Sequence, residues 1–170
     1  MRLLRLAAFF LTVLLPGYYV AVVTFHPERI PRMLLPAFLG SVSATPLSAM
    51  GEALALFLLY ELLREAGLRL PDAIGHTLSV VGGIVIGDAI VTAGLVGLPM
   101  IIIIALTAVS AFAVPSLYEP VTILRFLFIF IGGILGLYGM VLGFLVLVVN
   151  LCGLHTLGTP LTAPIAPWQP

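Results

Sequence analysis

The chain has 170 residues, of which 62% are hydrophobic and only 8% are charged. Soluble domains contain about 25% charged residues, so this composition indicates an integral membrane protein with one membrane domain. Seven arginines balance seven acidic residues and lysine is absent, which argues against a nucleic-acid partner. The single cysteine, Cys152, excludes an internal disulfide, and three scattered histidines form no zinc-ligand pattern. We therefore predict no metal site and no cofactor.

Five apolar segments follow one another along the chain. They cover residues 3–25, 46–63, 73–98, 100–114 and 121–152. The first resembles a signal peptide because Arg2 and Arg5 lie beside its start, but its apolar run is longer than usual and no clear cleavage site follows. We expect a retained membrane helix. The fold class predicted is all-α, with four to five hydrophobic helices in a transmembrane domain over residues 1–158 and a Pro-rich tail over residues 159–170.

The second segment carries acidic residues at two depths. Pro46 is at its head, where a helix tolerates proline, and Gly67 is predicted to end it. Glu52 and Glu61 are nine residues apart, so they lie on opposite faces of a straight helix and form no paired-carboxylate site. Glu52 is a candidate for a pore lining or a buried partner. Glu61 begins a cluster that we expect to form a salt-bridged turn at the membrane surface, together with Arg64, Glu65 and Arg69.

The third segment has a carboxylate at its centre. Asp88 is the only charge in the 26-residue run 73–98, which is long enough to cross the roughly 30 Å apolar layer of a bilayer. A carboxylate at that depth costs about 2.5–3.5 kcal/mol on insertion scales, so such residues face a protein interior or a water-filled path. Thr77 and Thr92 project within about 60° of Asp88 on a helix. These three residues and Glu52 are our candidates for an ion path, although Asp88 could equally be a buried hydrogen-bonding group.

Glycines recur at helical spacing in two segments. Such small-residue stripes let helix backbones approach closely in membranes. In the third segment the stripe projects within about 40° and consists of Gly83, Gly87 and Gly94. In the fifth it is predicted to be a continuous seam within about 60°, formed by Gly132, Gly136, Gly139 and Gly143. Both stripes predict helix packing and assembly into a homo-oligomer.

The fourth segment lies between Pro99 and Pro115 and is about one turn short of a comfortable span. It is either a short crossing or a re-entrant piece buried in protein. With five crossings, Arg64, Arg69 and Arg125 share one side with the amino terminus, which is the better positive-inside arrangement. With a re-entrant fourth segment, both termini share a side and Arg125 lies opposite.

Signatures of an enzyme are missing from the sequence. The serines and histidines are accompanied by no nucleophile elbow, phosphate-binding loop, dinucleotide fingerprint or metal-ligand spacing. We therefore expect a protein that is not an enzyme.

Long ordered runs of the sequence resemble one known family. They include LREAGLRLP at 63–71, VVGGIVIG at 80–87, AGLVGLPM at 93–100 and ALTAVSAFAVP at 105–115. The first segment, LLRLAAFFLTVLLPGYYVAVVTFHPERIP, and the end, LGLYGMVLGFLVLVVNLCGLHTLGTPLTAPIAP, fit as well. Together they resemble the membrane domain of the A subunit of GerA-type spore germination receptors, over nearly the whole chain.

This resemblance implies a function and partners. Such A subunits lie in the spore inner membrane, a bacterial cell membrane, with a transporter-like B subunit and a lipoprotein C subunit. They are thought to form an oligomeric ring that conducts cations when the receptor senses a nutrient, which triggers germination. Family members hold both soluble ends in the cytoplasm, which favours an even number of crossings and a re-entrant fourth segment.

The sequence also departs from the family pattern. A large soluble N-terminal domain and a basic C-terminal tail are usual in the family and are missing here, so we interpret the chain as the membrane domain alone. His76 replaces the usual glutamine, and Thr92 stands where glutamine or glutamate is common. Both changes reduce the polar lining.

Two hypotheses remain for the function. In the first, several copies form a nutrient-gated cation channel. In the second, the chain is a non-conducting membrane anchor that assembles a receptor complex. A proton-coupled transporter has little support because no internal repeat is visible.

Overall fold

The computed structural model describes residues 2–33, 35–36, 38, 40, 45–69, 72–115, 118–153, 155–156 and 159–160, of which residues 2–3, 72–81, 155–156 and 159–160 are described by their backbone alone. Within these residues the predicted all-helical fold is confirmed. The helices are α1 (Arg2–Phe25), the 3₁₀ turn η1 (Pro27–Arg29), α3 (Ala49–Arg69), α4 (Asp72–Thr92), α5 (Leu98–Ala111) and α6 (Tyr118–Gly153). Two residues each of β1 (His155–Thr156) and β2 (Thr159–Pro160) pair antiparallel. The rest of the predicted tail lies outside the described residues.

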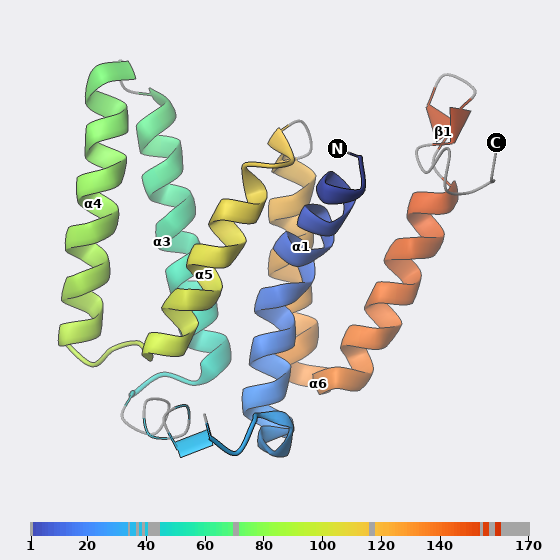
Figure 1. The fold of residues 1–170 in the computed structure, drawn as a ribbon, viewed down its shortest axis with the longest axis horizontal. Coiled ribbons are helices and arrows are strands. Elements are labelled where there is room, and N and C mark those ends of the chain that lie inside the picture. The colour runs from blue at the N-terminus through green and yellow to red at the C-terminus, as the bar shows by residue number, and fades with distance from the viewer. Residues whose placement is uncertain are drawn as a thin grey trace.

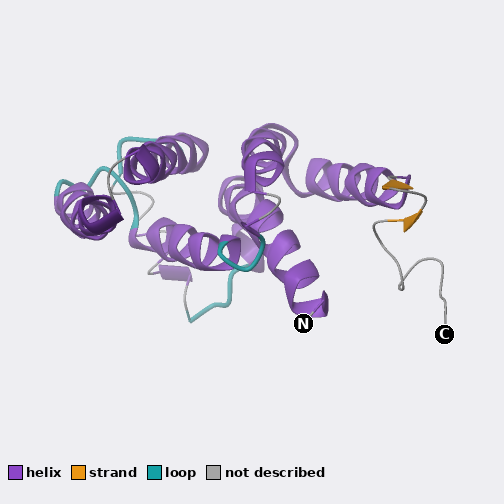
Figure 2. Cartoon of the chain, turned by 90° about the horizontal axis from the view of Figure 1, so that it is seen from above, coloured by secondary structure: helices purple, strands orange, loops and turns teal. Residues whose placement is uncertain are grey.

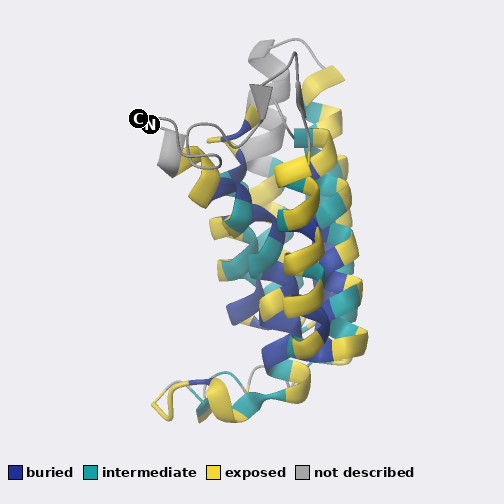
Figure 3. Ribbon diagram, turned by 90° about the vertical axis from the view of Figure 1, so that its right-hand side faces the viewer, coloured by how far each residue is buried: buried dark blue, intermediate teal, exposed yellow. Residues whose placement is uncertain are grey.

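The helices run up and down beside one another (Figure 1). α1 packs against α6 and α5, α3 contacts α5, α6 and α4, and α4 lies at the edge of the bundle against α3 (Figures 1 and 2). One apolar cluster joins α1 to α6 around Val13 and Phe128, and another joins α3, α5 and α6 around Phe57, Met100 and Ile129. Buried residues are concentrated inside the bundle, and exposed residues follow its outer faces (Figure 3).

Two helix ends differ from the sequence prediction. α3 continues through Gly67 to Arg69, so the prediction that Gly67 ends this helix is wrong. α4 ends at Thr92 instead of continuing to Leu98. The chain turns at Gly94, where φ is +66°, a conformation that glycine adopts without steric cost. Gly97 is then extended and caps α5, with Pro99 in the first turn, where the missing N–H of proline costs no hydrogen bond.

The fifth predicted segment is not one straight helix. Gly136 has φ 62° and ψ −150°, which interrupts α6, and the second half folds back beside the first (Figure 1). A Cβ built on Gly143 would lie 3.1 Å from the Phe128 ring, whereas a straight helix separates residues 128 and 143 by about 22 Å. The predicted continuous glycine seam is therefore wrong, because Gly139 and Gly143 face the first half of the same helix.

The first half of α6 meets α1 at a pair of glycines. A Cβ on Gly132 would collide with the carbonyl oxygen of Gly17, and a Cβ on Gly17 would lie 2.5 Å from the carbonyl oxygen of Phe128. Real Cβ contacts are never this short, so only glycine permits this backbone approach. This contact fixes α1 against the helix that carries Arg125.

Candidate functional site

Two charged side chains, Glu52 and Arg125, are fully buried within the bundle, each with 0% relative exposure. Acidic and basic residues are almost never fully buried unless they have a partner, because removing a charge from water costs several kcal/mol even after relaxation. These two residues, and the polar groups near them, define the candidate site.

Glu52 joins three parts of the chain. Its carboxylate accepts a hydrogen bond from the Thr45 hydroxyl, which precedes α3, and one from the backbone N–H of Gly97 at 3.4 Å. Gly97 is the N-cap of α5, so the carboxylate lies at the positive end of that helix dipole, where a negative charge is stabilised. Glu52 thus has hydrogen-bond donors and a favourable field, which explains how its burial is tolerated.

Arg125 has no comparable set of acceptors. Among the described residues, none of its three guanidinium nitrogens has a hydrogen-bond partner. Its guanidinium carbon lies 4.9 Å from the centre of the Phe57 ring, which is within the range of a cation–π contact. Glu61 and Tyr118 are close enough to interact with it electrostatically. Arg125 is therefore a buried charge that is stabilised only by an aromatic face and by nearby polar groups.

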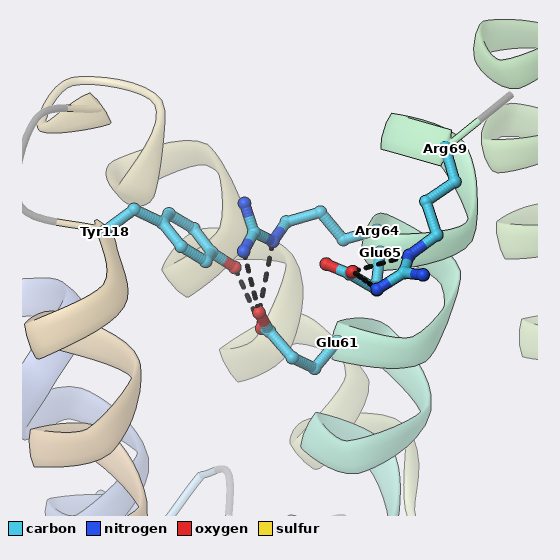
Figure 4. A network of polar contacts seen from close by, with 5 residues as sticks. All are labelled: Glu61, Arg64, Glu65, Arg69 and Tyr118. Atoms are coloured by element: carbon cyan, nitrogen blue, oxygen red, sulfur yellow. Dashed lines mark hydrogen bonds and ion pairs between the residues drawn. The ribbon is translucent and has the colours of Figure 1, made fainter. Parts of the chain in front are cut away.

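A polar clamp, which we define as Glu61, Arg64 and Tyr118, connects the end of α3 to the start of α6 (Figure 4). The Arg64 Nε and one terminal nitrogen donate to Glu61 Oε1 at 3.2 and 2.9 Å. The Tyr118 hydroxyl donates to Glu61 Oε2 at 3.0 Å, and the Arg64 guanidinium lies over the Tyr118 ring at 3.4 Å.

A second ion pair follows on α3. Arg69 lies 2.7 Å from Glu65 and 79% of its side chain is exposed. The expected salt bridges of this cluster are thus confirmed. Its two pairs differ in exposure, because the Glu61–Arg64 pair is covered by Tyr118 and only 27–29% exposed.

The predicted ion-path residues do not gather at one place. Asp88 is exposed on α4, whereas Glu52 is buried between α3 and the turn before α5. The Thr92 hydroxyl donates to the backbone carbonyl of Asp88, one turn earlier, instead of to its carboxylate. The side chain of Thr77 lies outside the described part of the structure.

The glycine stripe of α4 faces open space. A Cβ on Gly83 or Gly87 would have no atom within 4 Å, and Gly94 belongs to the turn after the helix. Gly83 and Gly87 are therefore free of contacts with the described part of the chain, and Asp88 projects about 100–140° away from them around the helix.

Sequence reasoning missed Arg125 and Tyr118 as members of the site. A signal was present for Arg125, which is the only charge between residues 121 and 153. A charge within an apolar segment needs a protein or water partner at this arginine as much as at Asp88. No comparable signal marks Tyr118, because its bond to Glu61 joins residues 57 positions apart. Among the described residues, no group of three or more histidine, cysteine or acidic side chains could hold a metal ion.

Comparison with known proteins finds similarity to spore germination proteins. The model of the Bacillus/Clostridium GerA spore germination protein family matches residues 1–170. Spore germination protein KA of Bacillus subtilis (strain 168) is 42% identical over 170 residues, which are 99% of this chain and 31% of that protein.

Two further relatives have similar coverage. The uncharacterized membrane protein YfkQ of Bacillus subtilis (strain 168) is 40% identical over 99% of this chain and 33% of its own. Spore germination protein GerLA of Bacillus cereus is 41% identical over 98% of this chain and 34% of its own. The chain thus spans about a third of the length of these relatives. No solved structure matches it.

Proposed function

Because the chain belongs to the GerA family of spore germination proteins, we propose that it is a multi-pass membrane subunit of a spore germinant receptor, in the spore inner membrane. The relative YfkQ is named a membrane protein. Residues 4–25 and 118–153 form helices long and apolar enough to cross a bilayer. Large apolar side chains on α6 are widely exposed, for example Ile123 at 72% and Val149 at 70%. A surface of this kind is typical of contact with lipid or with other membrane helices.

The break at Gly136 supports a particular topology. The halves of α6, residues 118–135 and 137–153, are about 27 and 25 Å long, close to the roughly 30 Å apolar layer. If each half crosses, α1, α3, α4, α5 and the two halves make six crossings. The start of α1 and the end of α6 then share a side, as Figure 1 illustrates. Arg64, Arg69 and Arg125 also fall on that side, so the charge distribution and the even number of crossings agree.

The observation that carries a channel function is the position of Asp88. Its carboxylate is exposed on α4, among apolar side chains such as Ile84 and Val85, which are 66% and 59% exposed. If the Asp88 carboxylate faced acyl chains, its insertion into the apolar layer would cost about 2.5–3.5 kcal/mol. A sister chain that packs on the open glycines Gly83 and Gly87 would shield that side of α4 from lipid. Asp88 projects about 100–140° away from these glycines, so it would then line a water-filled path beside the contact. We infer an oligomeric, nutrient-gated cation channel that triggers germination.

Partners follow from the same proposal. A receptor A subunit of this kind would work with a transporter-like B subunit and a lipoprotein C subunit, and we assign the chain no enzymatic activity. In the alternative proposal the chain is a non-conducting anchor of the receptor complex. The hydrogen bonds of Glu52 favour the anchor in part, because they give that carboxylate a structural role.

Replacing Asp88 by asparagine distinguishes the two proposals. The chain, alone and with B and C subunits, is reconstituted into vesicles loaded with a K⁺ indicator, and oligomers are measured by cross-linking. The channel proposal expects Asp88→Asn to change cation flux with assembly intact. The matched control, Glu65→Gln, alters an exposed ion pair at the end of α3 and should leave flux unchanged. Lost assembly with Asp88→Asn, or wild-type vesicles without flux, supports the anchor.

A further inference from the structure

An apolar groove lies between α1 and the second half of α6. It encloses about 510 Å³, and its walls come from residues 7–18 of α1 and residues 137–144 of α6. The fold-back at Gly136 creates this groove, because it places the second half of α6 beside α1. Leu11, Tyr18 and Val141 in its walls remain 48%, 47% and 59% exposed. The groove is thus open, and no described part of the chain covers it.

One arginine marks one end of the groove. Arg29, in the turn that follows α1, is the only charged residue among the described residues that line the groove. Its side chain is exposed, and it forms no salt bridge with any described acidic residue. The opposite end is near Ala7. Between residues 7 and 18, α1 contributes about 16 Å of the groove wall, and α1 continues to Phe25 before the turn that carries Arg29.

From this geometry we propose that the groove binds an anionic phospholipid, with one acyl chain along α1 and the phosphate at Arg29. The proposal rests on the membrane location proposed above. A groove of this volume is in the range of small-ligand sites, its walls suit a hydrocarbon chain, and the guanidinium is a preferred phosphate ligand. The groove is at the opposite side of the bundle from α4 (Figures 1 and 2), so a lipid there leaves the proposed oligomer face accessible.

Tryptophan quenching by brominated lipids tests this site. The native Trp168 is first replaced by phenylalanine, and one tryptophan is introduced by Leu11→Trp in the groove. The matched control, Leu127→Trp, is on the first half of α6, where the leucine is 51% exposed against 48% for Leu11. Each variant is reconstituted in vesicles of equal parts phosphatidylglycerol and phosphatidylcholine, and the bromine is carried by one lipid or by the other.

We expect phosphatidylglycerol to occupy the site beside the groove tryptophan about fivefold more than phosphatidylcholine, and therefore to quench it more strongly when it carries the bromine. Fivefold is the ratio that corresponds to the roughly 1 kcal/mol that one arginine contributes near an anionic lipid. The control tryptophan should show no such preference. Arg29→Gln should abolish the preference, whereas Arg32→Gln, which changes a nearby exposed arginine outside the groove, should retain it.

Three results overturn the proposal. Equal quenching by the two lipids at Leu11→Trp excludes a specific anionic site. Quenching at Leu127→Trp together with full protection at Leu11→Trp means that protein covers the groove, from a second copy or another subunit. If neither tryptophan is quenched, the chain does not insert in the bilayer, and the proposed membrane function fails together with the lipid site.

Discussion

Gly132→Ala offers a direct test of the contact between α1 and α6. The added methyl group would collide with the Gly17 carbonyl oxygen and would lie 3.1 Å from its carbonyl carbon. Carbon atoms pack best at about 3.5–4.0 Å, so the two backbones would have to separate by about 0.4–0.9 Å. Overpacking of this kind costs about 1–3 kcal/mol, and we take the upper end because the obstacle is backbone, which cannot change rotamer. Alanine favours the helix over glycine by about 1 kcal/mol, which offsets part of this cost. We therefore expect the free energy of unfolding to fall by about 2 kcal/mol.

Unfolding in mixed micelles measures this loss. The chain is titrated with sodium dodecyl sulfate while its helix content is followed by circular dichroism. Gly153→Ala is the control, because the added methyl group meets no described atom within 4 Å, and it should be neutral or stabilising. Equal stability of Gly132→Ala and the wild type would refute the close backbone contact, as would an equal loss in Gly153→Ala.

Two further predictions concern Arg125 and Gly136. Arg125→Met should stabilise the chain by about 1–3 kcal/mol in the same titration, because it removes a buried charge that has no hydrogen-bond partner among the described residues. A loss of stability would reveal an acceptor for this arginine. Gly136→Ala should strain the backbone by about 1–3 kcal/mol, because φ 62° and ψ −150° lie in a region essentially restricted to glycine. The distance between spin labels at Ile123 and Val149, measured by electron resonance, tests the fold-back of α6. A straight helix would separate these two positions by about 39 Å. A distance of that size in the wild type would contradict the break at Gly136.

Much of the helical architecture could be predicted from the sequence, because each helix lies largely within one of the apolar segments. The position of Pro99 also indicated where α5 begins. The break in α6 could not be predicted in this way. Glycines in a long apolar segment are compatible with a continuous helix, and the fold-back at Gly136 depends on contacts such as that of Gly143 with the Phe128 ring. Those contacts are tertiary, so a local pattern does not contain them.

The candidate site shows the same division. The rule that a charge in an apolar segment needs a partner singled out both Asp88 and Glu52. It did not show that Glu52 is buried against the N–H of Gly97 while Asp88 is exposed. The difference arises from the position of each helix, since α3 is surrounded by other helices and α4 lies at the edge. Burial is a property of the assembled bundle, and no single segment specifies it.

Two carboxylates of α3 connect it to two other helices. Glu52 bonds to Gly97, the residue that precedes α5, and Glu61 bonds to Tyr118, the first residue of α6. These two acids are about 13.5 Å apart along one continuous helix, so α3 is a rigid spacer between the turn before α5 and the start of α6. A tilt of α3 would therefore displace both junctions together.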